Sequence, residues 1–128
     1  MDQIAFYRAK LAWEIDSWDV FTALERGESI ILVDGRSPAA FEQETLPGAI
    51  NLPHRTLCAE NTAHLPKDRL LVAFCDGIGC NGSTRTALKL AELGFQIKEL
   101  QGGIDWWKRD GYATTVQAGR ALACGCQG

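Results

Sequence analysis

Two cysteines, Cys75 and Cys80, lie in the stretch FCDGIGCNGSTR, between an apolar run and a segment with helical spacing. Thiols in such a loop can bind a metal, form a disulfide or act as nucleophiles. Three glycines, Gly77, Gly79 and Gly82, allow the loop backbone to curl with its N–H groups inward. Thiols near a helix N-terminus have lowered pKa values, because the dipole and the unpaired amides stabilise the thiolate. The pattern therefore predicts that Cys75 is a nucleophile.

The other uses of these cysteines are less well supported. A resolving role for Cys80, through a Cys75–Cys80 disulfide, stays open and would make the chain a thiol redox module. Zinc would need a second ligand pair, and His54 and His64 are not arranged as one. His54 follows the stretch INLP and is placed where it can face the loop, although a lone histidine is more often a surface or structural residue. We therefore expect no metal and no cofactor.

Composition limits the class of protein. The chain has 128 residues, 46% of them apolar, which suits one domain with one core. A net charge of −3, with Lys and Arg scattered singly, argues against nucleic acid as a partner. The chain has no apolar run near the ~18 residues of a membrane span, and its start lacks an export signal, so we expect a cytoplasmic protein without a membrane partner. The five cysteines should then persist as thiols rather than form a disulfide scaffold.

Hydrophobic periodicity predicts strands that alternate with helices. The expected helical segments are 2–13, capped by Asp2; 17–26, capped by Asp16 or Ser17; 38–44; one turn within 55–68; 83–93, with Ser83 as its N-cap; and 104–112. The expected strands are 30–33, one within 46–53, 70–74 and one within 95–103. Such alternation indicates a parallel sheet covered by helices on both faces.

The N-terminal helix has Ile4, Tyr7 and Leu11 at helical spacing, which predicts one apolar face. We expect Trp13 and Trp18 to cover apolar surface near the first two helices. Residues after about Tyr112 are small and weakly patterned, so they are expected to form a tail.

Three stretches resemble the rhodanese family of sulfurtransferase domains in order and spacing: LVDGRSPAAFEQETLPGAINLP, LLVAFC and GFQIKELQGGIDWWKRDGY. They include an Asp-x-Arg, a Pro-Gly-Ala turn, a cysteine after a strand and a Gly-Gly followed four residues later by Trp. The resemblance covers about residues 16–112. It implies a single rhodanese-like α/β domain with a central five-stranded parallel sheet flanked by helices on both faces. We divide the chain into an N-terminal helix (1–14), this domain (15–113) and a C-terminal tail (114–128).

The resemblance also implies roles for single residues. Cys75 matches the family nucleophile, which accepts sulfane sulfur as a persulfide. Asp34 and Arg36 match an acidic and basic pair near the site, which we interpret mainly as an ion pair that fixes the loop. Gly102, Gly103 and Trp107 match the closing signature, with Trp107 in the core and Trp106 partly exposed.

The chain departs from the family pattern in two places. Glu44 and Thr45 stand where the family usually has Gly-His. The loop is also two residues longer than the usual Cys-x-x-Gly-x-Arg loop, and Cys80 lies inside the insertion. The stretch CNGSTR is an alternative six-residue loop that ends at Arg85. We favour Cys75 as the nucleophile, because Cys80 would lie only three residues from the helix cap.

Phosphatases that share the fold are a weaker resemblance, with a cysteine loop that ends in Arg six positions after the cysteine. From Cys75 that position is Asn81, so phosphoryl chemistry is poorly supported.

We therefore predict an enzyme that moves sulfane sulfur from thiosulfate or a persulfide donor to a thiol or cyanide acceptor. A sulfur-acceptor protein is a further candidate partner. A non-catalytic sulfur-carrier or protein-binding domain remains an alternative, since the longer loop changes the anion pocket.

The tail motif Cys124-Gly-Cys126 can chelate or relay sulfur, but an exposed tail is the simpler interpretation. Arg85, in the first helical turn, offers a cation for the charge of the substrate. The predicted catalytic residues are Cys75 and Cys80, supported by Asp34; the predicted substrate-binding residues are Arg36, Asp76, Gly77, Ile78, Gly79, Asn81, Gly82, Ser83 and Arg85.

Overall fold

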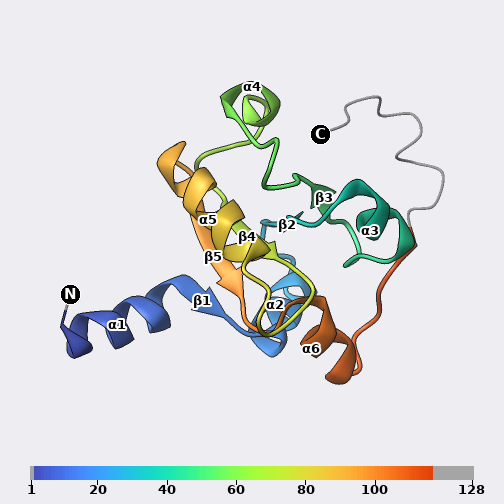
Figure 1. The fold of residues 1–128 in the computed structure, drawn as a ribbon. Coiled ribbons are helices and arrows are strands. Elements are labelled where there is room, and N and C mark those ends of the chain that lie inside the picture. The colour runs from blue at the N-terminus through green and yellow to red at the C-terminus, as the bar shows by residue number, and fades with distance from the viewer. Residues whose placement is uncertain (1, 117–128) are drawn as a thin grey trace.

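The computed structural model describes residues 2–116, which form alternating helices and strands (Figure 1). Their order is α1 (Gln3–Trp13), β1 (Glu14–Ile15), α2 (Ser17–Glu25), β2 (Ile30–Asp34), α3 (Pro38–Gln43), β3 (Ile50–Asn51), α4 (Ala59–Thr62), β4 (Leu70–Phe74), α5 (Gly82–Glu92), β5 (Gln96–Leu100) and α6 (Gly103–Arg109). None of the helices in this part of the chain is long and apolar enough to cross a membrane.

The five strands form one sheet in the order β1-β5-β4-β2-β3, and every neighbouring pair is parallel. Of the three central strands, β2 and β4 are the apolar runs of the sequence, with Val33 paired to Ala73. Strand β5 is more polar and lies beside β4, with Ala73 paired to Glu99. Because the strands are parallel, their carboxyl ends share one edge, where ligands collect in open α/β sheets. The predicted α/β fold with a five-stranded parallel sheet is confirmed.

The sheet separates two apolar clusters, because successive side chains on a strand point to opposite faces. Leu32, Val72 and Phe74 pack with side chains of α2 and α6, including Trp107. Val33, Leu71 and Ala73 pack on the other face with Leu90 of α5 and residues flanking α4, as the alternating pattern of burial requires. Trp107 is buried and Trp106 is 42% exposed, as predicted from their adjacent helical positions.

One local expectation was wrong, and one strand was not predicted. The N-cap of α5 is Asn81 rather than Ser83, whose hydroxyl instead donates to Glu99 (2.7 Å). Strand β1 was not expected, since two residues carry no periodic signal; it pairs with the end of β5.

The apolar face predicted for the first helix is not buried. Asp2 does cap α1, accepting the Ala5 amide at 2.7 Å, but Ile4, Tyr7 and Leu11 are all exposed. Helix α1 extends away from the body of the domain (Figure 1) and contacts mainly β5, so most of its surface meets no neighbour. Trp13 of α1 and Trp18 of α2 are exposed as well.

After α6 the chain returns to the domain. The backbone of Thr115 exchanges hydrogen bonds of 2.9 and 2.8 Å with that of Thr45. Backbone pairing with the domain thus continues at Thr115, within the segment 114–128 that we assigned to the tail. Cys124 and Cys126 lie outside the described residues.

Candidate active site

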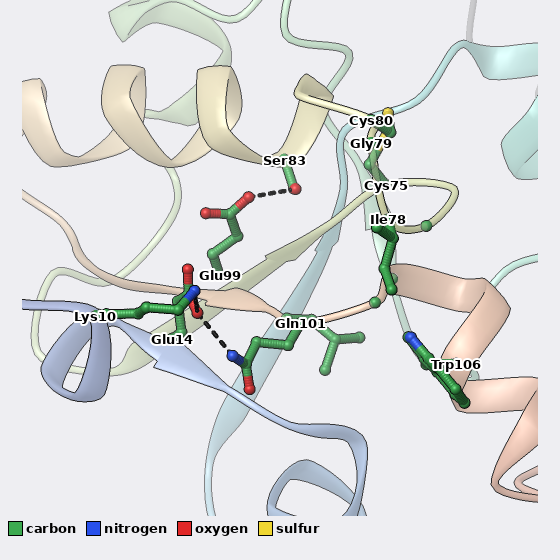
Figure 2. Close-up of a pocket in the computed structure, with 14 residues that line it drawn as sticks. Lys10, Glu14, Cys75, Ile78, Gly79, Cys80, Ser83, Glu99, Gln101 and Trp106 are labelled. Carbon is green, nitrogen blue, oxygen red and sulfur yellow. Dashed lines mark hydrogen bonds and ion pairs between the residues drawn. A yellow bond between two sulfur atoms is a disulfide. The ribbon is translucent and has the colours of Figure 1, made fainter. Parts of the chain in front are cut away.

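Cys75 directly follows β4 at the carboxyl edge of the sheet, and its side chain is only 5% exposed. It forms a disulfide with Cys80, with 6.4 Å between the Cα atoms (Figure 2). The loop closes through a turn in which the Cys80 amide donates to the Gly77 carbonyl (3.1 Å). The expectation that these two cysteines persist as thiols was therefore wrong for this form of the chain, because the turn returns Cys80 to Cys75. Cys58 is a free, exposed cysteine.

The start of the loop is held by the N-terminus of α6. The amides of Ile104 and Asp105 donate to the carbonyls of Cys75 and Asp76 at 3.0 and 2.9 Å. The first amides of a helix have no partner inside the helix, so here they fix the loop instead. The Gly102-Gly103 signature of the sequence begins the helix that provides them.

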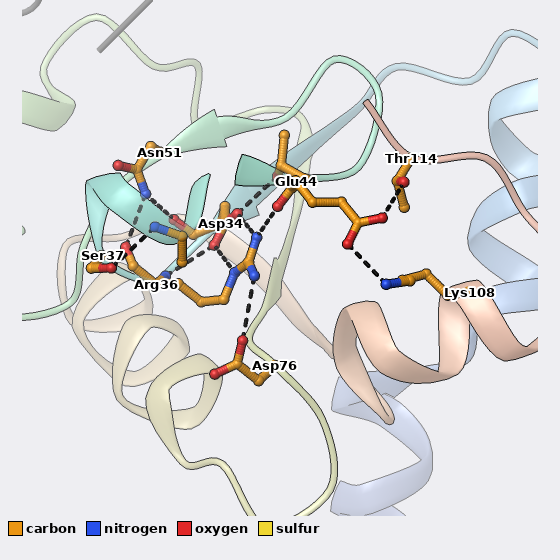
Figure 3. A network of polar contacts seen from close by, with 10 residues as sticks. Asp34, Arg36, Ser37, Glu44, Asn51, Asp76, Lys108 and Thr114 are labelled. Atoms are coloured by element: carbon orange, nitrogen blue, oxygen red, sulfur yellow. Dashed lines mark hydrogen bonds and ion pairs between the residues drawn. The ribbon is translucent and has the colours of Figure 1, made fainter. Parts of the chain in front are cut away.

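A buried ion pair supports the same end of the loop (Figure 3). The Arg36 guanidinium donates to Asp34 from Nε at 3.0 Å and from Nη2 at 2.8 Å, and the Arg36 amide adds a bond of 3.0 Å. Arg36 Nη1 reaches Asp76 in the loop at 3.3 Å. Burial lowers the pKa of Arg36, but its hydrogen bonds to Asp34 and Asp76 outweigh this and raise it above its ordinary value. The predicted role of this pair in fixing the loop fits this geometry.

Thr45 completes the network; in the sequence it stands out only as a departure from the family pattern. Its buried hydroxyl donates to Asp34 at 2.8 Å, and Arg36 also donates to the carbonyl of Glu44. Asn51, at the end of β3, donates to the carbonyls of Asp34 and Arg36 at 3.0 Å each. Four donor groups from Arg36 and Thr45 thus bind the Asp34 carboxylate, which has about four acceptor positions. Together with the bonds from Asn51, they hold the segment after β2.

The first turn of α5 lies directly against the disulfide. A Cβ atom at Gly82 would stand 2.9 Å from Cys75 Sγ and 3.5 Å from Cys80 Sγ, so only glycine allows this approach. The positive end of the helix dipole therefore lies at the sulfur atoms, as the sequence predicted.

Two hollows of about 470 Å³ each border the disulfide from different sides. The first is lined by Cys75, Gly77, Ile78, Gly79, Cys80 and Ser83 together with Lys10, Glu14, Glu99, Leu100, Gln101, Gly102, Gly103 and Trp106 (Figure 2). The second is lined by Cys75, Asp76, Cys80, Asn81 and Gly82 together with Gly35, Arg36, Ser37, Pro38, Ala40, Pro53, His54, Arg55 and Thr56. The charged residues that line the first hollow are Glu14, Glu99 and Lys10, and those that line the second are Arg36, Arg55 and Asp76. Negative charge therefore exceeds positive charge around the first hollow, and the reverse holds around the second.

Most of the predicted site residues meet at these two hollows: Cys75, Asp76, Gly77, Ile78, Gly79, Cys80, Asn81, Gly82, Ser83 and Arg36. Asp34 is buried beneath them. Arg85 lines neither hollow; its Nε lies 3.4 Å from Asn81 Oδ1, and it borders a third hollow farther along α5. Lys10, Glu99, Gln101 and Arg55 were missed, because they come from elements far apart in the sequence.

Asp76 and the two cysteines each place one potential metal-ligand atom within 4.8 Å of the others. Both sulfur atoms are bonded to each other here, and a metal needs thiolates. This form of the site therefore offers a metal only a carboxylate.

Comparison with known proteins agrees with this geometry. A model of the rhodanese-like domain family matches residues 18–110. A sulfurtransferase of Allochromatium vinosum is 32% identical over 106 residues, which cover 83% of this chain and 97% of that protein. A thiosulfate sulfurtransferase, GlpE, of Pseudomonas syringae is 30% identical over 72% of this chain and 85% of that protein. The crystal structure of protein BH2092 from Bacillus halodurans superposes with a TM-score of 0.84 at 35% identity, covering 89% of this chain and 84% of that one.

These likenesses support a role of the sulfurtransferase type. The domain match covers both cysteines, the Asp34–Arg36 pair and the helix that holds the loop. The chain therefore belongs to the rhodanese-like domain family.

Proposed function

We propose that the chain is a sulfurtransferase that carries sulfane sulfur on Cys75. The observation that carries this proposal is the position of Cys75 at the carboxyl edge of the sheet, against the first turn of α5 and between two hollows. Within residues 2–116, the backbone N–H groups of residues 76–79 donate to no protein acceptor. They are available to stabilise a persulfide or a bound oxyanion.

The reaction has two displacements. The Cys75 thiolate attacks the outer sulfur of thiosulfate; the sulfur–sulfur bond of thiosulfate breaks, and sulfite leaves with the electron pair. An acceptor thiolate or cyanide then attacks the outer sulfur of the Cys75 persulfide. The sulfur–sulfur bond of the Cys75 persulfide breaks, and Cys75 leaves as a thiolate. The acceptor carries the sulfur away as a persulfide or as thiocyanate. Such covalent transfer predicts ping-pong kinetics.

The Cys75–Cys80 disulfide is the inactive, oxidised form in this scheme, because Cys75 must be a free thiolate to accept sulfur. Thiol reductants of the kind present in the cytosol would reopen it, so the scheme is compatible with the cytoplasmic location expected from the sequence. The disulfide also favours a second candidate function, a thiol redox module. There the Cys80 thiolate attacks the inner sulfur of the Cys75 persulfide, forms the disulfide and expels hydrosulfide.

Mass spectrometry after reduction and thiosulfate treatment tests the proposal. Arg69 and Arg85 place both cysteines on one tryptic peptide, 70–85, so variants must assign the modified residue. The reduced wild type and Cys80→Ser should gain the mass of one sulfur on this peptide, and Cys75→Ser should not. A gain that survives Cys75→Ser but not Cys80→Ser would make Cys80 the nucleophile. No gain in any of the three proteins would exclude persulfide chemistry.

Cys80→Ser also separates the candidates. A sulfurtransferase keeps single-turnover transfer from the persulfide to cyanide in this variant. A redox module instead releases hydrosulfide in the wild type and retains its persulfide in Cys80→Ser. A sulfur carrier without turnover would form the persulfide but show no steady-state production of thiocyanate.

A further inference from the structure

The hollow on the His54 side of the disulfide continues along α5. It shares His54, Arg55 and Asn81 with the third hollow, of about 660 Å³, which is lined in addition by Arg85, Leu88, Lys89 and Glu92. One wall is α5, on which positions 81, 85 and 89 are four residues apart and so lie on one face. The other wall is the segment after β3, which Lys89 holds by donating to the His54 carbonyl. We call this continuous feature the basic groove.

Three cations of the basic groove lack carboxylate partners, whereas Arg36 is paired with Asp34 and Asp76. Arg55, Arg85 and Lys89 form no ion pair with any of the described residues, and all three act on His54. Partial burial, then the charges of Arg55, Arg85 and Lys89, lower the pKa of His54. Two carboxylates border the groove: Asp76, which binds Arg36, and Glu92 at its far end. The whole chain is acidic, with a net charge of −3, so this concentration of positive charge is local.

The length of the groove limits which ligands can contact all of its cations. At 1.5 Å per residue, the face of α5 from Asn81 to Lys89 spans about 12 Å. A thiosulfate ion at the sulfur atoms is too short to reach the far end. A ligand that contacts both ends needs its sulfur and its anionic groups roughly 10 Å apart, which is about the length of an extended tripeptide.

We infer that the basic groove binds a low-molecular-weight peptide thiol, or its persulfide, whose carboxylates lie far from its sulfur. The inference rests on the proposed function and names the class of acceptor or donor. The sulfur lies at the disulfide end, Arg55 borders the middle, and Arg85 and Lys89 bind the distant carboxylates. Arg85 and Lys89 act as specificity residues and have no role at the reacting sulfur.

Glutathione provides the test, because it combines one thiol with two carboxylates on a tripeptide. We would prepare the Cys75 persulfide of the full chain and measure kcat/KM for glutathione and for 2-mercaptoethanol, a thiol without carboxylates. The double variant Arg85→Gln/Lys89→Gln should lose about tenfold or more with glutathione, since hydrogen bonds to charged groups are being removed. It should stay within about twofold of the wild type with 2-mercaptoethanol.

The double variant Arg8→Gln/Arg69→Gln is the matched control, because it removes the same net charge at exposed positions outside the groove. It should react with glutathione as the wild type does. An equal loss in this control, or an equal loss with 2-mercaptoethanol, would overturn the inference and leave the proposed function standing.

Binding of S-methylglutathione, which cannot accept sulfur, supplies a measurement independent of transfer. Calorimetry should show that S-methylglutathione binds the wild type. It should bind Arg85→Gln/Lys89→Gln at least several times more weakly. Absence of binding to the wild type would overturn the inference. Binding that is lost in the variant would support it even if no persulfide formed on Cys75, a result that would remove only the proposed function.

Discussion

The two parts of the cysteine loop are held very differently. Its start, Cys75 and Asp76, receives backbone bonds from α6 and a side-chain contact from Arg36, which is itself bound to the buried Asp34. Its tip, Ile78 and Gly79, has no hydrogen bond to the described chain; Ile78 is 80% exposed, and a Cβ at Gly79 would meet no atom within 4 Å.

The start of the loop is therefore suited to hold a side chain in place, and the tip is suited to move. A nucleophile must be held close to its working geometry by its neighbours, and the start of the loop meets that need for Cys75. Segments with few buried contacts open at low free energy, and the tip meets that description. Reduction would therefore free Cys80 to move while Cys75 stays in place, which suits a nucleophile with a resolving partner.

The largest expected effect comes from breaking the held end. Asp34→Asn removes the charge that Arg36 faces while Arg36 stays mostly buried, and breaking one partner of a buried pair costs about 3–5 kcal/mol. Urea denaturation of the reduced protein measures the loss. Arg26→Gln is the control, because its pair with Glu28 is exposed and spans 3.8 Å; it should change the free energy of unfolding by less than ~1 kcal/mol. A loss below 1 kcal/mol for Asp34→Asn would show that the pair does not hold the loop.

The contrast also explains what sequence alone could predict. Apolar runs such as Leu70–Phe74 and the glycines of the loop have local signals, so the sheet, α5 and the position of Cys75 could be predicted. Thr45 and Glu99 reach the site through pairings between distant segments, and no local pattern reports such pairings. The burial of Asp34 follows from the same long-range packing.

Sequence alone could not decide whether the Cys75–Cys80 disulfide forms, for a related reason. A spacing of five residues permits it, but the turn from Gly77 to Cys80 decides whether the two sulfur atoms meet. The apolar spacing of α1 was misleading, because amphipathic periodicity predicts that a face can be buried but does not supply the surface that covers it.

A smaller effect is expected at the tip. Gly79 has a φ of +92°, a conformation that costs a residue with a Cβ about 1 kcal/mol or more. Gly79→Ala should therefore lower the unfolding free energy of the oxidised protein by roughly 1 kcal/mol. The reduced protein should lose less, because its tip can relax. Denaturation of both forms checks this, and an equal loss in the two forms would mean that the tip keeps its conformation without the disulfide.

The contact between Asp76 and Arg36 should contribute less than the buried pair. Asp76 is 73% exposed, and solvent screens an exposed partner. We expect Asp76→Asn to cost at most ~0.5 kcal/mol and to leave the persulfide yield on Cys75 unchanged, since the bonds from Ile104 and Asp105 to the loop carbonyls remain. The effect should shrink further in high salt. A loss as large as that of Asp34→Asn would place the main support of the loop in the side chain of Asp76 rather than in the backbone.

The smallest effect is expected at Ile78. Replacing a large apolar side chain usually costs several kcal/mol when it is buried, but Ile78 is 80% exposed. Ile78→Ser should therefore change the unfolding free energy by less than about 0.5 kcal/mol. It should also leave thiosulfate kinetics unchanged, because the group that residue 78 contributes to the proposed site is its backbone N–H, which the substitution keeps. Leu90→Ala, at a fully buried position of α5, is the contrasting variant and should cost about 2–5 kcal/mol. If Ile78→Ser destabilised the protein by more than 1 kcal/mol, the tip would be packed in solution, and Cys80 would no longer be the movable end of the loop.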